Sequence, residues 1–167
     1  MKIPQLKTIV KEITIALLIL FVLSNTISYI RKPNLPIDKI PKIEAKLLNG
    51  KKFIAENGKP LLIHFWATWC PTCKLEAPNI EYISKKYSEY HILTIAVNSG
   101  SNEDVRDYIQ KRNFTFGVIN DKDAVLAKDF NIKAYPTTLI YDKDGKLKFS
   151  EVGYTTTAGL LTRLSIL

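Results

Sequence analysis

The sequence has little of the residues that build metal centres and disulfide-held scaffolds. It contains two cysteines, two histidines and one methionine in 167 residues, and both cysteines belong to one Cys-x-x-Cys at positions 70 and 73. A secreted scaffold held by disulfides would carry more cysteines, and a four-ligand zinc site would usually show a second pair. His64 and His91 do not follow zinc-finger spacing. We therefore expect no metal site and no cofactor beyond the redox-active pair Cys70 and Cys73.

The chain also lacks the distributed basic surface of a nucleic-acid-binding protein. Its formal charge is +8, but residues 1–42 carry seven lysines and arginines against two acids, whereas residues 43–167 carry seventeen against fourteen. The excess flanks an apolar segment, which favours membrane phosphates over nucleic acid as the partner. We expect no nucleic-acid partner.

A stretch without charged residues occupies positions 13–30. As a helix, eighteen residues would be about 27 Å long, which is marginally enough to cross a hydrocarbon core of about 30 Å. The most apolar part, residues 15–23, also suits a signal peptide, although no Ala-x-Ala follows it. We expect residues 1–30 to form an uncleaved signal anchor, a transmembrane helix that contacts lipid through residues 13–30. A cleaved signal peptide is the alternative.

The flanking charges do not decide the orientation of this segment, because lysines and arginines lie on both sides of it. A single apolar segment at the N-terminus favours export of everything behind it. Residues 31–42 hold three prolines among charged residues, which predicts a semi-rigid tether. The remaining residues, 43–167, are expected to form one globular domain.

The Cys-x-x-Cys lies where a buried strand should give way to a helix. Residues 61–66 are nearly all apolar, as in a strand buried on both faces, and Leu75, Ile80, Ile83 and Tyr87 then predict one apolar helix face. The unpaired N–H groups of a helix start favour a thiolate over a thiol. We therefore expect Cys70 to be the exposed nucleophile of lowered pKa.

Two further residues of the motif fit this chemistry. Pro71 can occupy the first helical turn without losing a hydrogen bond that the helix needs. Cys73 lies one turn further on, where it could attack a mixed disulfide at Cys70 and release the partner.

The rest of the domain alternates strands and helices before it ends in a hairpin and a helix. Asn49-Gly50 predicts a two-residue hairpin turn within residues 43–54. The pattern further on predicts strands at 92–97, 116–119, 137–141 and 146–152, and helices after Ser101 or Asn102, at 124–130 and from about 156. This order indicates an α/β domain.

Two segments together resemble the thioredoxin superfamily over about residues 43–167. They are Phe-Trp-Ala-Thr-Trp-Cys-Pro-Thr-Cys at 65–73 and Tyr-Pro-Thr-Thr at 135–138. Glu76 and Pro78 are similar to the TlpA-like, membrane-anchored branch, and residues 151–160 look most like its ScsD subgroup (suppressor for copper sensitivity D) of protein disulfide oxidoreductases. Cys-Pro-Thr-Cys also occurs in cytochrome c maturation reductases, so the motif does not separate these two. The resemblance implies a thioredoxin-like fold, a central mixed sheet flanked by helices.

The resemblance also implies site residues outside the Cys-x-x-Cys. Pro136 would be the family's cis-proline beside the cysteines; the alternative is a trans proline opening an edge strand. Glu76 would share a helix face with Cys73 and exchange protons with it, unless it is a solvated surface acid. His64 stands where many thioredoxins have a buried Asp that assists the second cysteine, and it is either a proton-transfer group or a hydrogen-bonded core histidine.

Five neighbours would pack around the sulfurs or tune their pKa values without reacting. Trp66 and Trp69 are interpreted as packing and shielding groups. The other three are structural or pKa-tuning residues: Pro71, Tyr135 and Thr137.

The leading hypothesis is a thiol–disulfide oxidoreductase anchored in a bacterial cytoplasmic (inner) membrane, with its catalytic domain on the periplasmic side. It would exchange disulfides with exported proteins through Cys70 and Cys73. Because TlpA-like relatives are mostly reductants recharged by a membrane electron carrier, we expect the same direction and the same kind of partner here. The alternative is a non-enzymatic copper-handling protein in which the two thiolates hold Cu(I).

Overall fold

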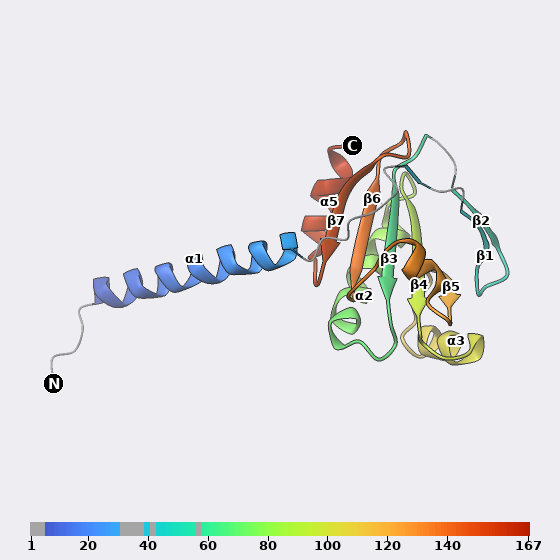
Figure 1. The fold of residues 1–167 in the computed structure, drawn as a ribbon, viewed down its shortest axis with the longest axis horizontal. Helices are drawn as coiled ribbons and strands as arrows, with labels where there is room; N and C mark the ends of the chain where they lie inside the picture. The colour runs from blue at the N-terminus through green and yellow to red at the C-terminus, as the bar shows by residue number, and fades with distance from the viewer. Residues whose placement is uncertain (1–5, 31–38, 41–42, 56–57) are drawn as a thin grey trace. The chain divides into compact units, whose positions relative to one another are not determined.

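The computed structural model in Figure 1 describes residues 6–30, 39–40, 43–55 and 58–167. The chain divides into two compact units, residues 1–32 and 33–167. The first contains helix α1 (Leu6–Ile30). Most of the predicted tether lies outside the described residues.

Helix α1 is 25 residues long and does not support the predicted transmembrane helix. Among the described residues, no helix combines the length and the apolar character needed to span a bilayer. The early turns of α1 contain Lys11 and Glu12, and polar residues return at positions 24–26.

The second unit is built on a mixed five-stranded sheet with the strand order β5-β4-β3-β6-β7 (Figure 1). Strand β3 is parallel to β4 and antiparallel to β6, and β4 and β5 are also parallel. A separate pair, β1 and β2, forms a two-stranded antiparallel sheet. The predicted central mixed sheet is confirmed. The elements are β1 (Glu44–Lys46), β2 (Lys52–Ile54), β3 (Leu61–Trp66), α2 (Pro71–Lys86), β4 (His91–Val97), α3 (Asn102–Lys111), β5 (Gly117–Asp121), α4 (Val125–Asp129), β6 (Thr137–Tyr141), β7 (Leu147–Val152) and α5 (Thr157–Ser165).

Strand β3 is the centre of this sheet, and all six of its residues are buried. Because side chains alternate across a strand, Leu62 and Trp66 face one core and Ile63 and Phe65 face the other. The first core is closed by residues of α2, α3 and α5, and the second by α4 and by residues flanking β1. The sheet therefore has helices on both faces, which explains why the run at 61–66 has almost no polar residues.

Two details of the predicted pattern are wrong. Leu75 is 70% exposed, because it lies five residues before Ile80 and a spacing of five does not keep one helix face. The buried face of α2 instead includes Cys73, Glu76 and Ala77. The β1–β2 turn is also longer than two residues, since the strands end at Lys46 and resume at Lys52.

Candidate active site

Cys70 and Cys73 form a disulfide where β3 leads into α2. Cys70 is the N-cap residue of α2, and its Sγ accepts a hydrogen bond from the backbone N–H of Cys73 at 3.1 Å. Pro71 is the first residue of the helix, where no partner for a backbone N–H is required. The sulfur of Cys70 therefore lies in the positive field of a helix start, as the sequence predicts.

Cys70 is less accessible than predicted, since only 4% of the residue is exposed and Cys73 is 1% exposed. The Tyr135–Pro136 loop lies beside it. The Tyr135–Pro136 peptide bond is cis, and the carbonyl oxygen of Tyr135 is 3.7 Å from Cys70 Sγ. This places Pro136 beside the cysteines, as the resemblance implies.

The loop around Pro136 is fixed on both sides by hydrogen bonds. Thr137 Oγ1 donates to the carbonyl of Ala134 at 2.8 Å, and Gly153 N–H donates to the carbonyl of Pro136 at 2.8 Å. Strand β6, which begins at Thr137, lies between β3 and β7, so the alternative of a proline opening an edge strand is wrong.

The two tryptophans of the motif occupy different environments. Trp66 is 3% exposed and packs against Tyr108 and Phe116 in the core that also contains both cysteines. Trp69 is 57% exposed, its Nε1–H donates to the carbonyl of Asn98 at 3.0 Å, and its ring meets that of Tyr135 edge-on. Trp66 therefore packs behind the disulfide, and Trp69 forms part of the surface around it.

Glu76 lies one helical turn beyond Cys73 and is completely buried. Neither carboxylate oxygen accepts a hydrogen bond of good geometry among the described residues, and only the backbone of Thr155 interacts weakly with the carboxyl. Burial raises the pKa of Glu76 to about 8, and the backbone of Thr155 opposes the shift only in part. The alternative of a solvated surface acid is wrong, and a proton on Glu76 is held near neutral pH.

His64 is also buried, on the face of β3 that carries Leu62 and Trp66 and packs against α2. Its Nδ1 is 2.9 Å from Thr138 Oγ1, while its Nε2 has no hydrogen-bond partner in the described part of the chain. Burial lowers the pKa of His64 to about 3, so the imidazole is neutral at physiological pH. It is a hydrogen-bonded core histidine with one free ring nitrogen.

Sequence reasoning missed the residues that hold the motif loop from the neighbouring strand. Ser99 Oγ accepts from the Thr68 N–H at 3.0 Å and donates to the carbonyl of Val97 at 3.0 Å. Asn98, whose carbonyl binds Trp69, has a φ of +46°. The sequence could have indicated their role. Both residues directly follow β4, and because β3 and β4 are parallel, their carboxyl ends lie at the same edge of the sheet as the motif.

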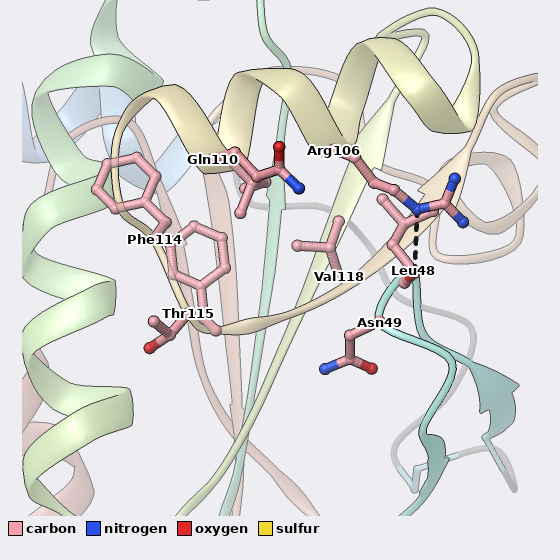
Figure 2. A pocket seen from close by; sticks show the side chains of 9 residues that line it. Leu48, Asn49, Arg106, Gln110, Phe114, Thr115 and Val118 are labelled. Carbon is pink, nitrogen blue, oxygen red and sulfur yellow. Dashed lines mark hydrogen bonds between the residues drawn. The ribbon is translucent and has the colours of Figure 1, made fainter.

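A separate hollow of about 240 Å³ lies between α3, β5 and the loop after β1 (Figure 2). Its walls are mostly apolar, and Arg106 at its edge donates from Nε to the carbonyl of Leu48 at 3.2 Å. It contains none of the predicted site residues. Among the described residues, no group of three or more His, Cys, Asp or Glu could hold a metal ion.

A cysteine pair that caps a helix beside a cis-proline loop, on a mixed α/β sheet, is the arrangement of a thioredoxin-like thiol–disulfide oxidoreductase. Comparison with known proteins agrees. Residues 36–150 match the AhpC/TSA family, and the chain belongs to that family.

Two of the three similar proteins below are named as thiol–disulfide or disulfide oxidoreductases. A "Thioredoxin-like protein" of Haemophilus influenzae is 31% identical over 163 residues, which cover 96% of this chain and 95% of the relative. "Sporulation thiol-disulfide oxidoreductase A" of Bacillus subtilis is 29% identical over 125 residues, 70% of this chain and 76% of the relative. The crystal structure of a secreted disulfide oxidoreductase of Mycobacterium tuberculosis superposes with a TM-score of 0.66 at 26% identity, covering 75% of this chain and 96% of that one.

Proposed function

We propose that the protein is a membrane-anchored, extracytoplasmic thiol–disulfide oxidoreductase that reduces disulfides in exported proteins, and that it belongs to the TlpA-like branch near the ScsD subgroup. The observation that carries the proposal is the Cys70 sulfur at the start of α2, next to the Tyr135–Pro136 loop. The relative from M. tuberculosis, described as secreted, supports the compartment.

In the reduced protein, the Cys70 thiolate attacks one sulfur of a substrate disulfide, and the other substrate sulfur leaves as a thiolate. The attacking thiolate is stabilised by a charge-assisted hydrogen bond from the Cys73 N–H and by the positive field of the helix start. The product is a mixed disulfide between Cys70 and the substrate.

Cys73 then resolves the mixed disulfide. Its thiol is buried, so its proton must pass to a nearby group before the sulfur attacks Cys70 Sγ and releases the second substrate thiolate. Glu76, one turn away on the same face of α2, is the proposed acceptor in those molecules whose carboxyl is ionised, a fraction that grows as the pH approaches its pKa of about 8. The resulting Cys70–Cys73 disulfide is reduced again by two electrons and two protons from a membrane electron carrier.

The central test is trapping with Cys73→Ser. This variant should accumulate mixed disulfides between Cys70 and exported proteins in cells, whereas Cys70→Ser and the double variant should not. A Cys73→Ser protein that forms no adducts contradicts the proposal. Tight stoichiometric Cu(I) binding without disulfide reductase activity would favour the copper-handling alternative instead.

Direction and anchoring need their own measurements. Thiol trapping in growing cells should find Cys70 and Cys73 mostly reduced, and loss of the membrane electron donor should leave them oxidised.

Attachment through the uncharged stretch at 13–30 predicts that the chain stays with membranes after alkaline extraction. Release into the soluble fraction would contradict the anchor and leave the oxidoreductase activity standing.

A further inference from the structure

The end of the sheet opposite the disulfide is formed by four segments that backbone hydrogen bonds hold together. Leu61, the first residue of β3, pairs with His91 on one side and Tyr141 on the other. The N–H of His91 donates to the carbonyl of Pro60, and the N–H of Gly58 donates to the carbonyl of Lys143, both at 2.9 Å. We call this the basal end, made of residues 39–40, 58–60, 82–91 and 142–146.

Exposed lysines outnumber exposed acids at the basal end. Its exposed acids are Glu89 and Asp144, while Asp142 is mostly buried and paired with Lys148 at 3.2 Å. Among the described residues, all but one of the exposed basal-end lysines lack a carboxylate within ion-pair distance. The exposed lysines here without such a partner are Lys39, Lys59, Lys86, Lys143 and Lys146, while the exposed Lys85 pairs with Glu81 at 2.7 Å.

Three tyrosines accompany the lysines. The ring centroids of Tyr82 and Tyr87 are 6.3 Å apart, and those of Tyr87 and Tyr90 are 6.2 Å apart. Lys86 Nζ donates to the Tyr82 hydroxyl at 2.8 Å and lies 5.1 Å from that ring's centroid. Tyrosine and lysine, each with an apolar body and a polar tip, are the side chains suited to the headgroup layer of a bilayer.

The chain also enters the domain at the basal end. Ile40 N–H donates to the carbonyl of Gly145 at 2.8 Å, and the backbone of Lys39 forms an isolated antiparallel β-bridge with that of Lys146. The segment proposed to attach the protein to a membrane precedes this point in the sequence. Cys70 follows the other end of β3, and the β3 arrow in Figure 1 points away from the basal end.

We propose that the basal end docks on anionic lipid headgroups and thereby holds the disulfide away from the bilayer, facing exported substrates. This inference rests on the membrane attachment in the proposed function, and not on the direction of the redox reaction. Charge complementarity identifies the occupant, because lysines that lack a carboxylate partner each strengthen binding to an anionic surface about fivefold. The tyrosines add interfacial contacts.

The test is lysine footprinting of the full chain on vesicles of phosphatidylcholine with and without phosphatidylglycerol. The protein is acetylated briefly and its peptides are analysed by mass spectrometry. Lys59 and Lys86 should react on the anionic vesicles at about one fifth of their rate on phosphatidylcholine alone, or more slowly. Lys74 on the first turn of α2 and Lys122 after β5 lie at the disulfide end and should react at an unchanged rate.

Charge reversal supplies matched variants. Lys59→Glu with Lys86→Glu should abolish the protection of Lys143 and Lys146, whereas the same charge change at Lys74 and Lys122 should preserve it. A second pair, Lys143→Glu with Lys146→Glu, should remove the protection of Lys59 and Lys86. This pair leaves the hydrogen bond from Lys86 to the Tyr82 hydroxyl intact. As a folding control, disulfide reductase activity is measured in solution. Both basal variants should keep the wild-type activity.

Each remaining outcome overturns the inference. Equal protection of lysines at both ends means unspecific adsorption. Co-sedimentation with vesicles without protection of any of these lysines means attachment without docking. Failure to co-sediment refutes the docking and the membrane attachment together, while the trapping experiment with Cys73→Ser still decides the oxidoreductase function on its own.

Discussion

Helix α2 buries two glutamates five residues apart, and their surroundings differ completely. Glu81 accepts hydrogen bonds from the N–H and hydroxyl of Thr115, both at 2.8 Å, and from the N–H of Phe116 at 3.2 Å, and it pairs with Lys85 at 2.7 Å. Burial would raise the pKa of Glu81, but these partners outweigh it and lower the pKa. Glu76 has only a weak interaction with the backbone of Thr155, and burial raises its pKa to about 8.

The difference separates a structural acid from the acid that we propose exchanges protons. A carboxylate with several donors keeps its charge and fixes the segments that supply the donors. A buried carboxyl without donors resists ionisation, and it can take up or release a proton near neutral pH. Only the second kind lies one turn from Cys73.

The largest expected effect is on the resolving step. Glu76→Gln should slow release of substrate from the Cys70 mixed disulfide about 100-fold, because a positioned general base contributes on that scale. Single-turnover mixing with a model disulfide measures this rate. Glu81→Gln is the matched control and should resolve at the wild-type rate; equal slowing in both variants would remove the distinction.

For the free energy of unfolding the order is reversed, so that substitution of Glu81 should have the larger effect and substitution of Glu76 the smaller. Glu81→Ala should lower the free energy of unfolding by about 2 kcal/mol, because the Thr115 and Phe116 donors lose their acceptor. Urea unfolding of the oxidised protein checks this. Glu76→Gln should cause no comparable loss, since Glu76 accepts no hydrogen bond of good geometry among the described residues.

The pH dependence of stability sharpens the comparison. Since the pKa of Glu76 is raised from 4.5 to about 8, the unfolded chain loses this proton first, and stability falls with rising pH between those values by up to about 1.4 kcal/mol per unit. Glu76→Gln should remove that fall. Glu81, with its lowered pKa, contributes stability above the unfolded pKa that is lost on acidification. Unfolding curves at a series of pH values that show the same slope for both variants would contradict this assignment.

The smallest effect is expected at His64. Because burial lowers its pKa to about 3, the imidazole remains neutral throughout the range in which Glu76 titrates. His64→Asn should therefore change stability by only about 1 kcal/mol, the value of one hydrogen bond to Thr138, and leave the pH midpoint of the resolving step in place. A shifted midpoint would show that His64 shares the proton with Glu76.

Local chemistry made much of the fold predictable. Residues 61–66 form β3, residues 137–141 form β6, and Ser101 caps α3 with its hydroxyl bound to the Asp104 N–H. Each of these depends on residues close together in the sequence. The hairpin predicted within residues 43–54 also forms, but its turn is longer than the two residues Asn49-Gly50. In that turn the N–H of Leu48 donates to the carbonyl of Val118 on a distant strand, a contact that the local sequence does not reveal.

The candidate site was predictable only in part. The Cys-x-x-Cys identifies the reacting atoms, but Glu76 and Glu81 are the same residue type on one helix. What distinguishes them comes from residues 115 and 116, more than thirty positions away, which reach one acid and not the other. No periodicity in α2 encodes that choice, so three-dimensional packing had to supply it.

The bond from the Cys73 amide to Cys70 Sγ has a practical consequence. The atom that caps α2 is also the atom that changes oxidation state, so the same N–H faces a neutral sulfur in the disulfide and an anionic one in the thiolate. A charge-assisted bond is shorter and stronger than a neutral one. The amide proton of Cys73 is therefore a built-in reporter, whose chemical shift and hydrogen-exchange rate follow the redox state of the pair without any added probe.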